Sequence, residues 1–231
     1  FIEDLRPIVG EVKEYDDGFY RMEKTYHRKL NDNLALQIRG LSNSTSTLNA
    51  DTIYFLRMMG YSSKSHWSQY QGETPVSDSL LGIKYIMTDK DYDKYYGEPL
   101  YDADDYDNDT YVVYKNPYHM SIAYAVDNDF AEFQLDDYEN PFERMNAMIS
   151  MMLGEEEMLQ IFVPAVQVSM TTKDVTKSTA ASHDLYKGDG GTITFEYMVP
   201  KNTELFVYFP TVYSREVKMT ANGKSVGKWG D

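Results

Sequence analysis

The side chains of this sequence best suited to contact a ligand are aromatic rings. The 231 residues include 21 Tyr and 2 Trp. Such rings stack on the apolar faces of sugars while their polar tips form hydrogen bonds. The candidate carbohydrate-binding residues are Trp67, Tyr70, Tyr92, Tyr95, Tyr96 and Tyr101. The alternative, which agrees with the intermediate burial of these residue types, is that Trp67 plugs the edge of the core and the tyrosines pad strands and loops.

One stretch of the chain, rich in Asp and Glu, could bind a hard cation such as Ca²⁺. Asp105, Asp107 and Asp109 have the one-three-five spacing of an EF-hand loop. Position six of that loop would be Thr110, where Gly is needed, and position twelve would be Asn116, where Glu is expected. The EF-hand interpretation therefore fails. A looser Ca²⁺ site is the alternative to a solvated acidic loop.

No motif in the sequence singles out a catalytic residue. The four histidines are scattered, without the spacing of a zinc site; they are His27, His66, His119 and His183. Fingerprints of serine hydrolases, P-loops and dinucleotide-binding turns do not occur. Paired carboxylates could hydrolyse a glycoside, yet the 37 acidic side chains leave no pair distinguished from the rest.

The composition of the chain disfavours or excludes several classes of partner and of chemistry. The net charge of −15 disfavours nucleic acid and anionic membranes, because both are polyanions. Cysteine does not occur, which excludes disulfides, thiol nucleophiles and thiolate metal sites. No apolar run reaches the roughly 20 residues needed to span a bilayer. The sequence opens at Phe1 with neither an initiator Met nor a signal peptide, so we expect a piece of a longer protein.

The first half of the chain is expected to mix helices and strands. Strands are predicted over 18–24, 83–88, 110–114 and 121–126. The second of these should be central, because both of its faces are partly apolar. Helices are predicted from Asn49 to Gly60 and from Thr74 to Gly82, with a capping side chain at each start and a glycine at each end. Loops and irregular segments are predicted over 41–47, 66–73 and 89–109.

The second half is expected to be mostly strand. One helix should begin at Asn140, with Pro141 in its first turn, and end at Gly154. Strands are predicted over 159–170, 192–198, 205–209, 216–221 and 224–228, with a hairpin turn at Asn222-Gly223. The resulting prediction is an α+β fold. It has an N-terminal mixed α/β subdomain, residues 1–135, and an antiparallel, jelly-roll-like β-sandwich with one leading helix, residues 136–231.

Several short segments, in order along the chain, resemble the extracellular part of YfhO-type bacterial membrane proteins. The most specific is 78–85, in which a helix stops at Gly82 and a strand starts at once. The other similar segments are 19–23, 31–34, 40–46, 53–61, 116–118, 140–143, Asn146 and 222–224. Relatives tend to have Leu-Pro where this chain has Met120-Ser121, so the local kink should differ.

The resemblance implies that the reactive groups of the protein lie elsewhere. Family members look like polytopic glycosyltransferases of the GT-C kind. They are thought to transfer sugar from a polyprenyl phosphate to surface polymers such as the lipoteichoic acid of Gram-positive bacteria. In that architecture the catalytic carboxylate lies between membrane helices, so the resemblance carries no catalytic residue onto this chain. The chain would be a non-catalytic domain on the extracellular face of the cell membrane, tethered by membrane helices outside it.

Two partners follow from this expectation: the membrane-embedded remainder of the same polypeptide and a cell-surface glycopolymer. Repulsion is an obstacle, because a chain of charge −15 should repel an anionic teichoic polymer. Divalent cations or D-alanyl groups would have to reduce that repulsion. The second hypothesis is a cell-surface carbohydrate-binding module or adhesin, and the third is a free-standing enzyme.

Overall fold

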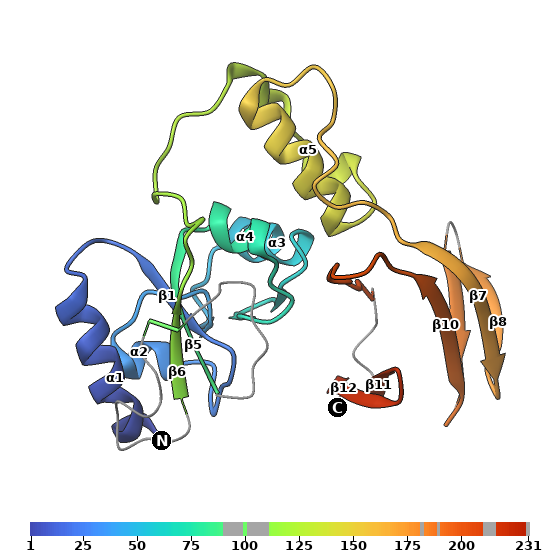
Figure 1. Ribbon diagram of the computed structural model, residues 1–231, viewed down its shortest axis with the longest axis horizontal. Helices are drawn as coiled ribbons and strands as arrows, with labels where there is room; N and C mark the ends of the chain where they lie inside the picture. Colours follow the sequence, from blue (N-terminus) through green and yellow to red (C-terminus); the bar gives the residue numbers. More distant parts are fainter. Residues whose placement is uncertain (90–98, 101–110, 181–182, 189, 210–215, 230–231) are drawn as a thin grey trace. The chain divides into compact units, whose positions relative to one another are not determined.

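A computed structural model describes residues 1–89, 99–100, 111–180, 183–188, 190–209 and 216–229 (Figure 1). Contacts divide the chain into two compact units, Phe1–Pro164 and Ala165–Asp231. The helices of the first unit are α1 (Ile2–Tyr15), α2 (Asp32–Leu36), α3 (Ala50–Met58), α4 (Pro75–Leu80) and α5 (Pro141–Leu153). Two short 3-10 helices, η2 (Asn128–Glu132) and η3 (Leu135–Asp137), precede α5.

The main sheet of the first unit has the order β1-β5-β6, with β1 parallel and β6 antiparallel to β5. Its strands are β1 (Arg21–Lys24), β5 (Ile83–Asp89) and β6 (Tyr111–Lys115). The predicted central position of the strand after Gly82 is thus confirmed. Each outer strand also bonds to a segment outside the sheet. Met22 N–H donates to Arg39 O over 3.0 Å, and Leu100 N–H donates to Val113 O over 2.7 Å.

A second, smaller sheet has the order β2-β4-β3. Its strands are β2 (Asn43–Ser44), β3 (Ser62–Lys64) and β4 (Trp67–Gln69). Residues 67–69 were expected to be irregular, and that prediction is wrong, because β4 pairs with β3, which immediately precedes it, and with the more distant β2. A pairing of this kind leaves no local pattern in so short a segment.

Helix α1 packs on one face of the main sheet. Its buried side chains are Leu5, Ile8, Val9 and Val12, and they share a core with Tyr85, Met87 and Val113 of the sheet. In Figure 1, α1 lies along the sheet on the side away from α3 and α4. The helix has no side-chain cap at its start and contains Pro7, so its apolar face rather than local signals accounts for it.

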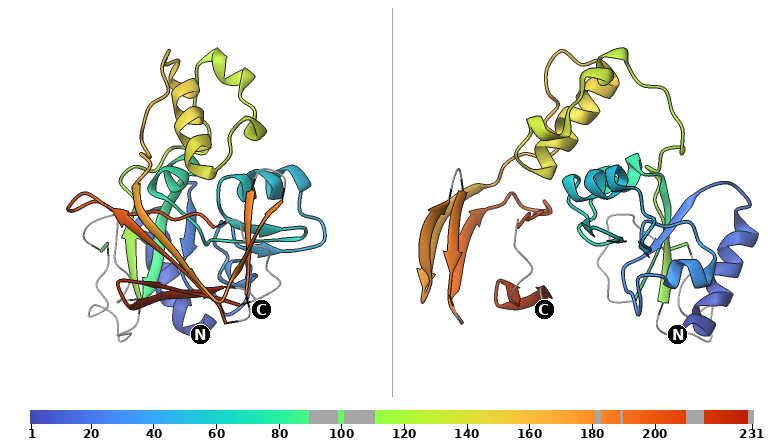
Figure 2. Two further views of the ribbon diagram at one scale, coloured as in Figure 1. Left: turned by 90° about the vertical axis from the view of Figure 1, so that its right-hand side faces the viewer. Right: turned by 180° about the vertical axis from the view of Figure 1, so that it is seen from behind.

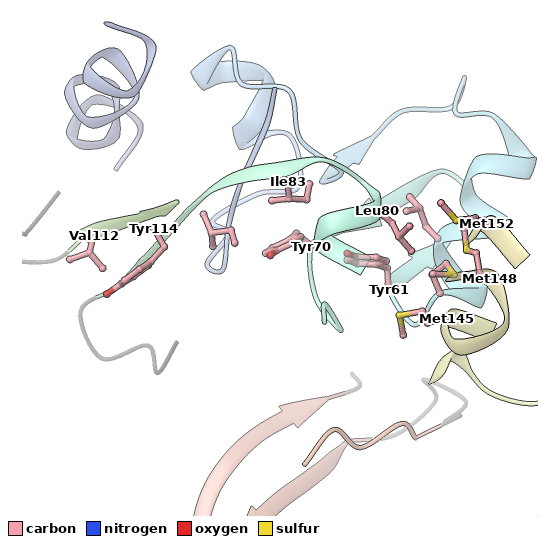
Figure 3. Packing of buried hydrophobic residues seen from close by; sticks show 12 residues of the cluster. Tyr61, Tyr70, Leu80, Ile83, Val112, Tyr114, Met145, Met148 and Met152 are labelled. Carbon is pink, nitrogen blue, oxygen red and sulfur yellow. The ribbon is translucent and has the colours of Figure 1, made fainter. Parts of the chain in front are cut away.

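Helices α3, α4 and α5 form the second core of the first unit. Asn49 caps α3 by accepting from Thr52 N–H over 2.9 Å, and Thr74 and Ser77 form a reciprocal capping box at α4. Figure 3 shows that Met145, Met148 and Met152 of α5 lie beside Tyr61 and Leu80 in this core. The predicted helices over 49–60, 74–82 and 140–154 are confirmed in type and closely in extent.

The contact division falls after Pro164, whereas the sequence placed a subdomain boundary near residue 135. Helix α5 was expected to lead the second subdomain, but its methionines pack with residues of the first unit. The Asn146 side chain also ties the chain beyond the helix to it. Its Nδ2 donates to Phe162 O over 2.8 Å, and its Oδ1 accepts from Phe162 N–H over 2.9 Å.

Two segments predicted as strands in the first unit are irregular instead. Residues 121–126 form no strand and are exposed, and 159–165, including the apolar run that begins at Ile161, is largely exposed as well. The first prediction is wrong, and the second, a strand over 159–170, holds only from Val166 onward, because an apolar run shows only that side chains can be buried, not that a strand partner exists. Ile161 is 44% exposed and Val163 72%.

Among the described residues of the second unit, the strands pair into three two-stranded ribbons, β7–β10, β8–β9 and β11–β12 (Figure 2). The strands are β7 (Val166–Lys173), β8 (Thr176–Ala180), β9 (His183–Lys187), β10 (Thr192–Met198), β11 (Val217–Ala221) and β12 (Lys224–Trp229). The Asn222-Gly223 hairpin is confirmed, with φ of 50° and 78° at the two residues. Residues 205–209 form no strand, contrary to the prediction. β7 is almost fully exposed on both faces, so the mixed α and β content is confirmed and the sandwich is not.

Candidate functional site

The most concentrated group of buried polar side chains lies where β1 meets the loop after α2. Glu23 and Lys24, adjacent on β1, are both 0% exposed. The Glu23 carboxylate accepts from Asn33 Nδ2 at 3.0 and 3.1 Å, from Ser42 N–H at 2.8 Å and from Lys24 N–H at 3.2 Å. The Leu41 N–H and the Ser42 hydroxyl donate to it as well. Burial raises the pKa of Glu23, although these donors act in the opposite direction.

Lys24 points to the other side of the same cluster and has three oxygen or nitrogen partners. Its Nζ lies 3.0 Å from Tyr26 O, 2.8 Å from His27 Nδ1 and 3.3 Å from Asp32 Oδ2. Burial lowers the pKa of the Lys24 ammonium, against the attraction of Asp32. The charge of this lysine is therefore compensated by a buried carboxylate rather than by water.

Asp32 closes the cluster on the side of α2. Its Oδ2 accepts from Arg28 N–H over 2.8 Å and from Lys29 N–H over 3.0 Å, in addition to Lys24. Burial opposes ionisation of Asp32, but these two backbone donors and the Lys24 ammonium lower its pKa. The carboxylate thus fixes the turn that leads into α2.

The pair Ser42 and His27 has the elements of a nucleophile and base but not their arrangement. An ammonium has only donors, so Lys24 obliges His27 Nδ1 to accept. The neutral ring then carries its proton on Nε2, which lies 3.4 Å from Ser42 Oγ and donates to it. Burial, and next the Lys24 charge, lower the pKa of His27 to about 4. The ring therefore cannot remove the Ser42 proton, in contrast to a serine hydrolase, where the base accepts from the serine.

The arrangement fits a structural role for this cluster. Ser42 is 3% exposed, and its Oγ also accepts from Tyr70 N–H over 2.9 Å. A Cβ on Gly40 would lie 2.3 Å from Asn33 Nδ2 and 2.4 Å from Glu23 Oε1. The loop therefore approaches the carboxylate closely enough to exclude any larger side chain at that position. The adjacent charges of Glu23 and Lys24 in a predicted strand were the only sequence signal for this cluster.

A shallow apolar groove of about 230 Å³ lies between α4, α5 and the chain around Tyr118. Among the described residues that line it, Ser79 is the one with an aliphatic hydroxyl, and that hydroxyl already donates to Pro75 O over 2.7 Å. Ligand pockets combine apolar walls with polar groups that orient the ligand. This groove offers mainly apolar contact.

Two predicted carbohydrate-binding residues fall within the described chain, and they differ. Trp67 is half-buried on β4. Tyr70 is 2% exposed, and its hydroxyl donates to Asp78 Oδ2 over 2.7 Å. Its ring belongs to the core with Tyr61, so the prediction that a sugar stacks on Tyr70 is incompatible with its burial.

The remaining predicted site residues lie outside the described residues: Tyr92, Tyr95, Tyr96, Tyr101, Asp105, Asp107 and Asp109. Carbohydrate stacking and Ca²⁺ binding at these positions stay predictions. Within the part of the chain that the structure describes, no group of three or more His, Asp or Glu side chains is placed to hold a metal ion.

Comparison with known proteins identifies a family. A family model described as "Bacterial membrane protein YfhO" matches residues 1–229. No curated protein and no solved structure matches the chain. None of the helices in the described ranges is long and apolar enough to cross a bilayer.

Proposed function

This chain belongs to the YfhO family of bacterial membrane proteins, and from that premise we propose that it is an extracellular, non-catalytic portion of a membrane glycosyltransferase. The parent protein would transfer sugar from a polyprenyl phosphate to a cell-surface polymer such as lipoteichoic acid. Membrane-spanning segments elsewhere in the polypeptide would tether this portion to the outer face of the membrane. Its own task would be to hold the acceptor polymer near the membrane-embedded catalytic site.

The observation that carries this proposal is the family match over residues 1–229. The structural roles of the segments that resemble the family support it. Glu23 and Asn33 anchor a loop, Asp78 accepts from the hydroxyls of Tyr61 and Tyr70, and Asn146 ties down the chain after α5. These residues are used in folding a scaffold, as expected if the reaction takes place elsewhere in the polypeptide.

The test uses the full-length parent protein in the bacterium that encodes it. Replacing residues 1–229 by a short flexible linker should abolish sugar addition to the surface polymer, measured by mass spectrometry of the purified polymer. The amount of the truncated protein in the membrane must match that of the parent, by immunoblot. Normal glycosylation at equal abundance would contradict the proposal.

A cell-surface carbohydrate-binding module or adhesin is the second candidate. The half-buried Trp67 favours it, because aromatic faces stack on sugars. A glycan array separates the two functions. Strong binding to a defined free glycan, combined with normal polymer glycosylation in the deletion strain, would favour the module.

A further inference from the structure

One end of the main sheet of the first unit gathers aromatic rings and cations. Because β1 and β5 are parallel, both begin at this end, and the antiparallel β6 finishes there. Helix α1 also ends here, and its link to β1 crosses the same end (Figure 1). We name the set formed by Tyr15, Phe19, Tyr20, Arg39, Lys84 and Lys115 the sheet-end rim.

Each cation of the sheet-end rim lies over an aromatic ring. Arg39 Cζ is 4.5 Å from the centre of the Phe19 ring, and Lys115 Nζ is 5.5 Å from that of Tyr15. Lys84 Nζ is 5.7 Å from the Tyr20 ring. These distances fall within the range of cation–π attraction, so the rings and charges hold one another in place.

Two rings of the rim are open to solvent. Phe19 is 68% exposed and Tyr15 is 54% exposed, although each already contacts a cation. By contrast, Tyr20 is 9% exposed and packs edge-on against Tyr85 at 4.9 Å between ring centres. The rim therefore has a buried aromatic base and two accessible rings at its margin.

The charge of the rim differs from that of the whole chain. The charge of Lys84 is neutralised by Asp16. The hydrogen bond from Lys84 lowers the pKa of the Asp16 carboxyl to about 2. Within the described residues, neither Arg39 nor Lys115 forms an ion pair, and both stand beside an exposed ring. The carboxylate neighbours in sequence are Glu14 and Asp17, both exposed. In its described part, a chain of net charge −15 thus presents two cations without a carboxylate partner next to its accessible rings.

We propose that the sheet-end rim binds a saccharide chain that carries spaced negative groups. Sugar faces would stack on Phe19 and Tyr15, while Arg39 and Lys115 bind phosphate or carboxylate groups of the same polymer. Arg39, Lys84 and Lys115 balance Glu14, Asp16 and Asp17, so the rim is locally near neutral and should repel an anionic polymer less than the rest of the acidic chain does. The identity of this polymer as the acceptor of sugar transfer rests on the proposed function. The binding of the polymer by the rim does not depend on that function.

The experiment measures binding of the 231-residue chain to delipidated lipoteichoic acid that carries sugar substituents, so that sugar rings and phosphates are both present, with neutral dextran and single-stranded DNA as comparison polymers. Phe19→Ala combined with Arg39→Ala should weaken binding to the teichoic polymer at least about tenfold, since stacking and charge pairing are lost together. Arg57→Ala is the matched control, because Arg57 is also exposed and lies 5.3 Å from the Tyr54 ring on α3, away from the rim. Arg57→Ala should leave the affinity of the original chain essentially unchanged.

Both rim positions are exposed, so circular dichroism and thermal melting should show unchanged folding of the double variant. Equal weakening by Arg57→Ala, no binding by the original chain, or tighter binding to DNA than to the saccharide polymer would each overturn the rim proposal. Failure of the proposed function looks different, since the chain would bind through the rim while its deletion from the parent leaves glycosylation normal.

Discussion

At the scale of single residues, the cluster around Lys24 shows how a small domain can bury a charged side chain when a carboxylate compensates the charge. Lys24 is 0% exposed and is held by Asp32, which two backbone N–H groups hold in turn. Removing one member of such a group leaves its partner buried and uncompensated, which costs more than the pair contributes. His27 belongs to the same group as a neutral acceptor, and this makes it sensitive to pH.

His27→Gln should reduce the loss of folding stability as the pH falls from neutral toward 4. The pKa of His27 is lowered from 6.5 to about 4, so below pH 6.5 the unfolded chain binds a proton that the folded chain does not. The stability from this group is complete above pH 6.5 and decreases as pH falls toward 4. With a reduction for the partial solvent exposure of His27, urea unfolding between neutral pH and just above pH 4 should show the free energy of unfolding of the original chain falling by about 2 kcal/mol more than that of the variant.

Glutamine is the chosen replacement because its amide can accept from Lys24 and donate to Ser42, as the ring does. His66→Gln is the control, since His66 is exposed. If His27→Gln and the original chain lose stability in parallel over this pH range, His27 is not neutral in the folded state.

At the scale of elements, the turn after α3 and the end of β4 approach through two glycines. Gly60 has φ of +97° and Gly72 has φ of +92°. A Cβ on Gly72 would lie 2.3 Å from Gly60 O, a backbone atom that cannot move aside. The two glycines therefore allow a shorter distance between the small sheet and α3 than residues with a side chain would.

Gly72→Ala should destabilise the first unit by about 3 kcal/mol or more, since positive φ and a backbone clash act together. Gly10→Ala is the control of opposite sign. Gly10 lies inside α1, and a methyl group there would meet nothing within 4 Å, so alanine should be neutral or stabilising by up to about 1 kcal/mol. Urea unfolding of both variants measures the difference. A Gly72→Ala loss below about 1 kcal/mol would show that the turn can open freely.

The elements that sequence reasoning located are those with local signals. Asn49, Thr74 and Asn140 each cap a helix with the side chain that the pattern required, and Gly82 separates α4 from β5 as expected. Helix α1 lacks such signals, because Phe1 provides no capping side chain and Pro7 lies inside it. Helix α1 is stabilised by contact with residues of the sheet that are distant in sequence. The local sequence of the helix does not reveal this contact.

At the scale of the whole molecule, the division after Pro164 yields a prediction about truncation. A chain of residues 1–164 contains both large cores and should unfold cooperatively, with a midpoint within a few degrees of that of the first transition in the full chain. A chain of residues 1–135 lacks the α5 methionines and should be markedly less stable. Thermal melting followed by circular dichroism compares the three. Equal stability of 1–135 and 1–164 would place the boundary near residue 135 after all.

The candidate site could be predicted from sequence only in part. Aromatic abundance drew attention to ring surfaces, but it could not separate the buried Tyr70 from the half-buried Trp67. The accessible rings Phe19 and Tyr15 were not selected, because their cation partners Arg39 and Lys115 come from distant segments. Proximity of that kind depends on strand order, and strand order is set by the packing of the whole unit.

The two main-chain bonds at the margins of the main sheet bear on self-association. Unpaired strand margins are templates on which another copy can add a strand and so begin aggregation. Here Arg39 O accepts from Met22 N–H on β1, and Leu100 N–H donates to Val113 O on β6. An invading strand would have to displace these bonds first. A membrane protein whose copies are held at high local density would benefit from such protection, because neighbouring copies meet repeatedly.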